Sequence, residues 1–122
     1  LHCTSNYPCD LEEINMNSMV TIHKRFGLDV GYSDHSNDNA VSNTAVAMGA
    51  SIIEKHFTLD NQLEGPDHKA SLNVEDFKKF VKSIRKVEKI LGSSAKKPTN
   101  SEMETKRYVE KKIFEKQFDE MF

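Results

Sequence analysis

Two histidines, His35 and His56, are the residues in this sequence whose type and spacing most favour metal chemistry. They stand 21 residues apart, and each follows a segment with strand character. Two imidazoles at the ends of successive parallel strands could converge on one divalent ion, with a hard ligand from a substrate completing its coordination. The alternative is that each histidine is a hydrogen-bonded loop residue. The spacing leaves both interpretations open.

Other polar residues occur at equivalent places, where a predicted strand ends and its loop begins. Ligands of parallel βα folds bind at that end of the sheet, because the loops gather there. Glu54 and His56 alternate along one strand, so they share a face and Lys55 points to the other. A buried Glu54 would need a metal, a base or substrate hydroxyls, the alternative being a structural ion pair. The residues of these clusters are Ser5, Asn6, Tyr7, Ser33, Asp34, His35, Glu54 and His56.

Two further segments suggest contacts with a phosphorylated or sugar ligand. Ser33 lies just after Gly31, where the backbone could approach a ligand closely, and a hydroxyl with neighbouring amides can cradle phosphate. The loop at residues 65–69 could form a lid whose Asp67 reaches a sugar hydroxyl, or it could simply be a turn. Cys3 and Cys9 have no base near them in the sequence, which argues against a nucleophilic role.

The hydrophobic pattern predicts three strand-then-helix units that would position these residues. Such alternation is typical of βα units and a parallel sheet. The strands are expected at residues 1–4, 29–33 and 50–57. The helices are expected to be capped by Asp10, Asp38 and Asn73 and closed by Gly27, Gly49 and Gly92, with Asp76 completing a capping box for the third.

Composition narrows the class of protein. The 122 residues carry a net charge of -2, which gives no electrostatic reason to expect nucleic acid or a membrane surface as partner. No segment is apolar enough to span a membrane, and the start at Leu1 has no signal-peptide pattern. The two cysteines are expected to be reduced thiols of a cytoplasmic protein. Because the chain opens inside a strand, we expect it to be part of a larger protein.

Three parallel strands would leave two exposed sheet edges and a half-covered core. The sequence therefore favours a fragment of a barrel, or a chain that completes itself by association. Residues 1–95 are expected to form this α/β portion. Residues 96–122 are expected to be a linker followed by a charged tail, either a weakly amphipathic helix or a segment ordered only against a partner.

Four blocks of sequence, at residues 2–8, 31–36, 53–60 and 64–71, resemble the sialic acid synthase family, which includes N-acetylneuraminate and legionaminic acid synthases. The resemblance runs from Leu1 to about Glu102. It implies the last three βα units of a (β/α)8 TIM barrel. The family's barrel is followed by an antifreeze-like domain, which the tail after Ile113 does not resemble, so that domain is expected to be absent.

The resemblance also implies a reaction: condensation of phosphoenolpyruvate with an N-acylated mannosamine-type sugar, with release of phosphate. His35 and His56 match the two protein ligands of a divalent metal, Mn²⁺ or Mg²⁺. Ser33 matches a phosphate-binding serine, and Ser5 and Tyr7 match positions near phosphoenolpyruvate. Glu54 and Asp67 match residues that bind the acceptor sugar.

The family's catalytic glutamate and phosphoenolpyruvate-binding lysines belong to the N-terminal half of the barrel. No catalytic residue is therefore assigned here, and the 122-residue chain alone is expected to be inactive. It is expected to form a homo-oligomer or to pair with the missing barrel half. The alternatives are a non-catalytic truncated remnant, a self-associating partial-barrel module, or an unrelated metal-dependent phosphotransfer or aldolase-type barrel.

Overall fold

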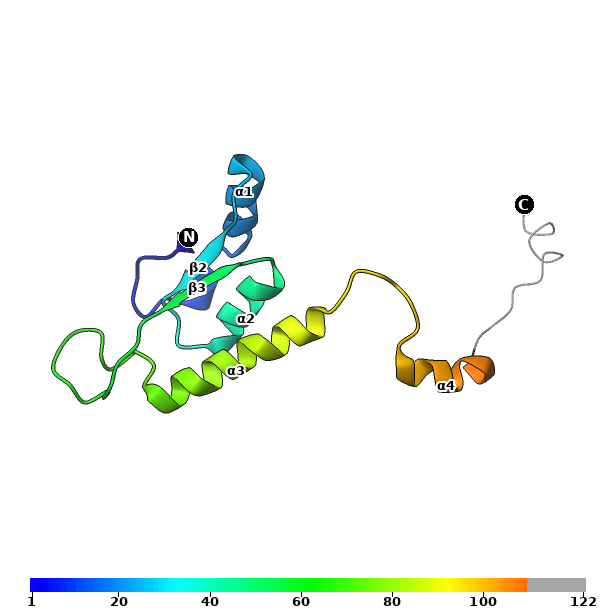
Figure 1. The fold of residues 1–122 in the computed structure, drawn as a ribbon. Coiled ribbons are helices and arrows are strands. Elements are labelled where there is room, and N and C mark those ends of the chain that lie inside the picture. Colours follow the sequence, from blue (N-terminus) through cyan, green and yellow to red (C-terminus); the bar gives the residue numbers. More distant parts are fainter. Residues whose placement is uncertain (110–122) are drawn as a thin grey trace. The chain divides into compact units, whose positions relative to one another are not determined.

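The computed structural model describes residues 1–109, which belong to two separate units, 1–92 and 93–122. The first unit repeats strand and helix three times (Figure 1). Its elements are β1 (His2–Cys3), a 3₁₀ turn η1 (Leu11–Glu13), α1 (Asn17–Phe26), β2 (Gly31–Asp34), α2 (Asn39–Ala47), β3 (Ile52–Lys55) and α3 (Val74–Leu91). In the second unit the structure describes α4 (Asn100–Val109).

The three strands form one parallel sheet in the order β1-β2-β3, which confirms the predicted α/β class with a parallel sheet. In this register Ser33 lies opposite Glu54, and Asp34 lies opposite Lys55. The strands are shorter than the predicted ones: β2 begins two residues later than predicted and ends at Asp34, and β3 is shortened at both ends and stops at Lys55. Residues 35 and 56 therefore begin the two loops.

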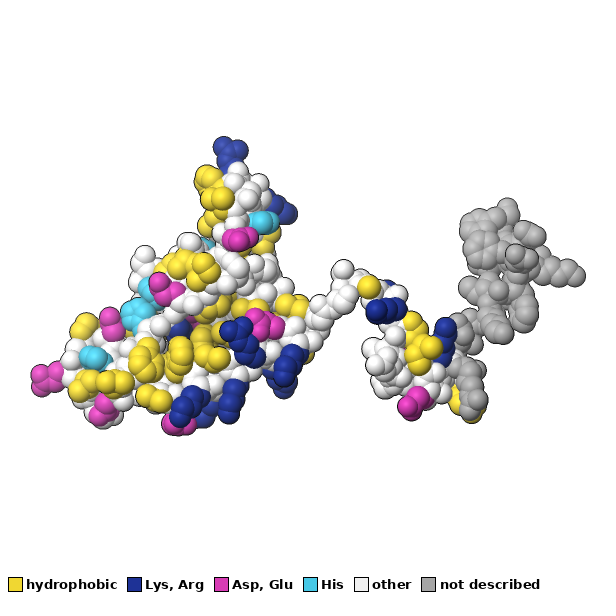
Figure 2. All heavy atoms as spheres, in the orientation of Figure 1, with side chains coloured by type: hydrophobic (Ala, Val, Ile, Leu, Met, Phe, Trp, Pro, Cys, Tyr) yellow, Lys and Arg dark blue, Asp and Glu magenta, His cyan; other side chains and the backbone are white. Residues whose placement is uncertain are grey.

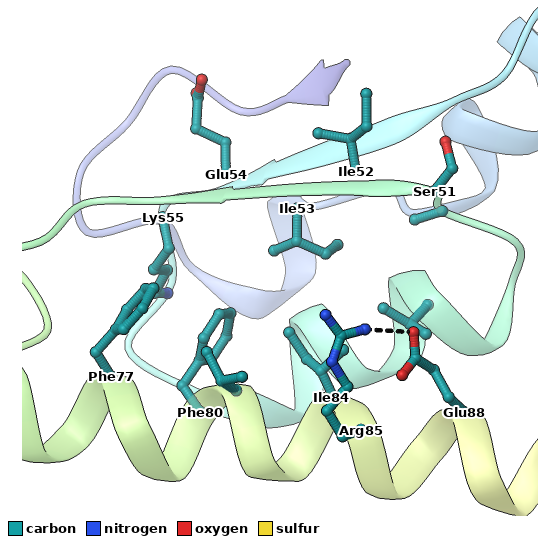
Figure 3. A pocket seen from close by; sticks show the side chains of 13 residues that line it. Ser51, Ile52, Ile53, Glu54, Lys55, Phe77, Phe80, Ile84, Arg85 and Glu88 are labelled. Carbon is teal, nitrogen blue, oxygen red and sulfur yellow. Dashed lines mark hydrogen bonds and ion pairs between the residues drawn. The ribbon is translucent and has the colours of Figure 1, made fainter.

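The helices cover one face of the sheet and leave the other open. Figure 3 shows Ile53 and Lys55 pointing toward α3, while Ile52 and Glu54 point away from it. Tyr32 lies on the helix-covered face and is fully buried. Its phenol oxygen has no hydrogen-bond partner among the described residues. The core around Tyr32 consists of Cys9, Ile14, Met19, Val30, Val41 and Ala45.

On the open face, Gly31 allows its neighbours to pack closely. A Cβ atom at Gly31 would clash with the Ile52 carbonyl oxygen and would lie 2.5 Å from Leu1 Cδ2. The prediction that Gly31 lets a ligand approach the backbone is wrong, since the side chains of Leu1 and Ile52 take up that space. Both are more than half exposed, so this apolar face lacks a cover in the described chain.

An open groove of about 540 Å³ lies between β3 and α3. Its floor is apolar, with Ile53, Phe80 and Ile84 among the lining residues (Figure 3). Figure 2 shows apolar side chains exposed along this side of the molecule. β3 is also an edge strand of the sheet. Within the described residues, the sheet therefore has an unpaired edge at β3 as well as an uncovered face.

Local capping signals explain where α2 and α3 begin. The Asp38 side chain accepts a hydrogen bond from the Ala40 amide at 2.8 Å, and the Asn73 side chain accepts one from the Asp76 amide at 3.0 Å. Side-chain acceptors at these positions satisfy amides that have no partner within the helix. At the other end of a helix, Gly27 has a φ of 65° and ends α1 as predicted.

The prediction that the first helix begins directly after Asp10 is wrong. The Asp10 side chain makes no capping bond, and only the short turn η1 follows it. Asn15 then adopts a φ of 48°, so α1 begins later, at Asn17. The loop after β1 holds η1 in this conformation, because Thr4 Oγ1 donates to the Glu13 carbonyl at 3.1 Å and Asn6 donates to the Glu13 carboxylate at 3.1 Å.

A helix does form in the expected tail, as α4. Thr99 and Glu102 cap it reciprocally: the Glu102 carboxylate accepts from the Thr99 amide, and Thr99 Oγ1 accepts from the Glu102 amide. The apolar residues on which the amphipathic prediction depends beyond Val109 lie outside the described residues. No helix within residues 1–109 is long and apolar enough to cross a membrane.

The Asn73 cap gives the first prediction. Replacing Asn73 with Ala should lower the free energy of unfolding by about 1 kcal/mol, because the first turn of α3 loses its side-chain acceptor. Asn73→Ser, which keeps an acceptor oxygen, should lose clearly less. Urea denaturation followed by circular dichroism measures both. Equal losses for the two variants would contradict the capping role.

Candidate functional site

Three aromatic rings meet where the strands end. The rings of Tyr7 and His56 are stacked, with centroids 4.1 Å apart and planes inclined by 25°. The His35 ring meets both edge-on, at 5.1 Å from His56 and 5.3 Å from Tyr7. The structure thus brings together two histidines for which the sequence left both convergence and separate loop roles open.

The parallel sheet explains this convergence. His35 is the first residue after β2 and His56 the first after β3, and the residues before them, Asp34 and Lys55, are directly opposite. The loop after β1 is attached to the same place, since the Cys9 amide donates to the His35 carbonyl at 2.8 Å. This bond holds the loop, with Tyr7, against both histidines.

Few donor atoms lie close to the two histidines. His56 Nδ1 lies 3.7 Å from Asp67 Oδ2, and the two ring nitrogens of His35 lie 3.7 and 3.8 Å from Cys3 Sγ. Within residues 1–109, no three His, Cys, Asp or Glu side chains converge closely enough to hold a metal ion by themselves. An ion held by these two imidazoles would need its remaining ligands from water, substrate or another part of the protein.

Tyr7 adds a phenol to this group of rings. Its hydroxyl lies 3.4 Å from Ser71 Oγ. Burial raises the pKa of the Tyr7 phenol above its ordinary value, and the hydrogen bond with Ser71 opposes that rise in part. The phenol is therefore neutral at neutral pH and can donate a hydrogen bond.

Ser33 and Glu54 form a second pair beside the rings. Ser33 Oγ donates to Glu54 Oε1 at 2.6 Å, which their opposed positions in the sheet allow. The Ser33 hydroxyl is buried, whereas Glu54 is exposed on the open face. Glu54 thus pairs with a hydroxyl rather than with the cation that the ion-pair alternative required. Sequence reasoning treated the two residues separately and missed their bond, which cross-strand register alone could have indicated.

The loop that carries Asp67 is closed at its base and braced inside. The Leu72 amide donates to the His56 carbonyl at 3.0 Å, and the Thr58 amide donates to the Leu72 carbonyl at 2.9 Å. Asn61 donates to two carbonyls of the loop, those of His68 and Ser71, both at 2.8 Å. A pocket of about 270 Å³ lies beside this loop, lined by His56, Phe57, Pro66, Asp67, His68 and Ser71.

Two contacts near the ring group were not predicted from the sequence, and one predicted site residue lies away from the rings. The prediction that Cys3 has no base nearby does not hold in space, because Cys3 lies beside His35 across the β1–β2 pair. Asp34 and Lys55 form a buried ion pair behind the histidines, with Asp34 Oδ1 3.1 Å from Lys55 Nζ. Ser5 is exposed, and no contact within the described residues joins it to the ring group.

Polar side chains gather at the carboxyl ends of parallel strands in both barrel-type and open-sheet α/β enzymes. The comparisons with known proteins specify which ones. Residues 1–96 match the model of the NeuB family. This match covers most of the sequence, and the chain belongs to that family.

Its relatives include proteins named as legionaminic, pseudaminic and N-acetylneuraminate-9-phosphate synthases. The chain is 49% identical over 113 residues to N,N'-diacetyllegionaminic acid synthase of Legionella pneumophila, covering 93% of this chain and 32% of the relative. It is 41% identical over 104 residues to human N-acetylneuraminate-9-phosphate synthase, covering 84% of this chain and 29% of that enzyme. The chain thus spans about a third of the length of these relatives.

A solved structure agrees with the fold. N-acetylneuraminic acid synthetase from Leptospira borgpetersenii serovar Hardjo-bovis superposes with a TM-score of 0.75 at 37% identity, over 87% of this chain and 37% of that one. The three βα units are therefore the arrangement that the same segment has in a sialic acid synthase.

The environment of Tyr7 gives a second prediction. The near-ultraviolet absorbance of the Tyr7 phenolate should appear with a midpoint above pH 10.0, the ordinary pKa of a tyrosine phenol. The reason is that burial disfavours the charged phenolate. Subtracting the titration of a Tyr7→Phe variant isolates this residue from the other tyrosines. A Tyr7 midpoint at or below the ordinary value would show that the phenol is solvated and does not pack as described.

Proposed function

We propose that this chain supplies the carboxyl-terminal part of the active site of a nonulosonic acid synthase, which condenses phosphoenolpyruvate with an N-acylated mannosamine-type sugar and releases phosphate. The observation that carries the proposal is the contact of His35, His56 and Tyr7 at the strand ends, in a chain of the NeuB family. Relatives named as legionaminic and pseudaminic acid synthases support the product class.

In this proposal the chain forms the last three βα units of a (β/α)8 barrel. The open face with Leu1 and Ile52 and the apolar groove beside β3 support it, because a closed barrel would cover both. The rest of the barrel would then complete the sheet. Assembly of the chain into a homo-oligomer and its cytoplasmic location stay predictions.

His35 and His56 are proposed to hold a divalent metal, Mn²⁺ or Mg²⁺, with positions left open for water and substrate. When bound, such an ion acts as a Lewis acid toward the aldehyde oxygen of the open-chain sugar. Asp67 lies beside His56 and lines the 270 Å³ pocket, and it is proposed to accept a hydrogen bond from a sugar hydroxyl. Its side chain is 55% exposed, so a ligand can reach it.

Ser33 is proposed to bind the phosphate of phosphoenolpyruvate, and Glu54 is proposed to bind the sugar. The single Ser33 proton is donated to Glu54 in the free chain. Binding of the phosphate of phosphoenolpyruvate would redirect that proton to a phosphate oxygen, and Glu54 would then accept from a hydroxyl of the sugar instead. Tyr7 and Ser5 would lie toward phosphoenolpyruvate, with Tyr7 acting as a neutral hydrogen-bond donor.

The reaction of this class joins C3 of phosphoenolpyruvate to the aldehyde carbon of the sugar. Water adds at C2, and cleavage of the C2–oxygen bond releases phosphate. The residues proposed here bind and orient the two reactants, a contribution that depends on both being held at once. Because the chain spans about a third of the length of its relatives, we expect no turnover from it alone.

Reconstitution tests this function. The 122-residue chain is mixed with the part of the Legionella pneumophila synthase that precedes its matched segment, and phosphate release from phosphoenolpyruvate is followed with Mn²⁺ and N-acylated amino sugars. We expect release that needs both pieces and is lost when the added chain carries His35→Ala and His56→Ala. Turnover by the chain alone would refute its proposed inactivity. A stable complex of the two pieces without phosphate release would contradict the proposed function.

A further inference from the structure

The ion pair between Asp34 and Lys55 lies behind the histidines, on the helix-covered side of the sheet. The side chain of Asp34 is 0% exposed and that of Lys55 is 4% exposed. Taking two charges out of water is costly, and apolar residues of similar size often stabilise such a place equally well. The burial of two paired charges here is therefore weak evidence for a stabilising role.

Every oxygen of the Asp34 carboxylate is used. Oδ1 accepts from the Ser36 amide at 2.8 Å and from the Ser36 hydroxyl at 2.7 Å, and it faces Lys55 Nζ. Oδ2 accepts from Ser42 Oγ of α2 at 2.5 Å. Lys55 Nζ also donates to the Ser36 carbonyl. The network is thus saturated with hydrogen bonds, which is the condition under which a buried pair holds one fixed geometry.

The position of the pair connects it to the site. Asp34 directly precedes His35, Lys55 directly precedes His56, and the two lie opposite each other in the β2–β3 register. The Asp34–Ser36 bond spans residue 35, so it fixes the backbone from which the His35 ring projects. Lys55 binds both ends of that turn from the neighbouring strand.

We propose that Asp34 and Lys55 are positioning residues, whose buried pair sets the His35 and His56 rings against each other. In metal sites generally, hydrogen-bonded partners of the ligands fix the orientation of each ring before a ligand arrives. The Asp34–Lys55 pair is proposed to have that effect on two neighbouring strands. The proposal rests on the proposed function, in which the two histidines act together. It predicts that loss of the pair separates the rings even while the chain stays folded.

The test uses the double variant Asp34→Asn, Lys55→Met, which removes both charges and so leaves neither buried alone. The readout is the set of nuclear Overhauser effects among the ring protons of Tyr7, His35 and His56, measured without metal. We expect these effects in the wild-type chain and their disappearance in the double variant. Unchanged effects in a folded double variant would overturn the proposal.

A matched control separates positioning from stability. Ser51→Ala removes the 3.0 Å bond from Ser51 Oγ to the Val30 carbonyl, at the opposite end of the same strands. It should lower stability without changing the Overhauser effects among the rings. Backbone amide spectra establish that each variant is folded at the temperature used. If the double variant does not fold, Ser42→Ala replaces it, because Ser42 donates a hydrogen bond to Asp34. Weakened Overhauser effects among the rings would then support the proposal, and unchanged effects would overturn it.

Calorimetry with Mn²⁺ distinguishes this proposal from the proposed function. Partners behind metal ligands typically change metal affinity about 10–100-fold, so we expect the double variant to bind Mn²⁺ at least about tenfold more weakly than the wild type. Equal affinities would overturn the positioning role. A wild-type chain that binds no Mn²⁺, but whose ring-to-ring Overhauser effects disappear in the double variant, would support positioning and contradict the metal site.

Discussion

The parallel register of β2 against β3 is the constraint on which the site depends. It places Ser33 opposite Glu54 and Asp34 opposite Lys55, and the alternation of side chains sends the first pair to the open face and the second to the helices. The two histidines follow as the next residue of each strand. A shift of one residue would exchange these faces and bury Glu54 among apolar side chains.

In the proposed synthase, the open face and the β3 edge are the surfaces on which the rest of the barrel would pack. Leu1 and Ile52 are exposed in the chain as described, and the groove at β3 has an apolar floor. Such surfaces are costly in water and favour association. Glu54 lies on the edge strand β3, and His56 directly follows it. In the proposed synthase, the strand that pairs with β3 would therefore also complete the site.

Local signals could be predicted from the sequence, and non-local ones could not. The caps at Asp38 and Asn73 depend on residues within three positions, and both are confirmed. The break at Asn15 was missed because it depends on contacts that Glu13 makes with the loop after β1. The bond between Ser33 and Glu54 was likewise missed, since register is set by pairing across 21 residues. The strand ends nevertheless indicated the site, because parallel strands share one carboxyl edge.

The metal site at the strand ends is tested most directly by adding Mn²⁺ to the isotope-labelled 122-residue chain and locating where it binds. Small amounts of Mn²⁺ should broaden the amide signals of Tyr7, His35 and His56 first. The signals of Gly27 and Gly49, which precede β2 and β3 at the other end of the sheet, should stay sharp. Replacing both histidines with alanine should abolish the selective effect. Broadening that spares both histidines and follows the acidic residues of α3 instead would contradict a metal site at the strand ends.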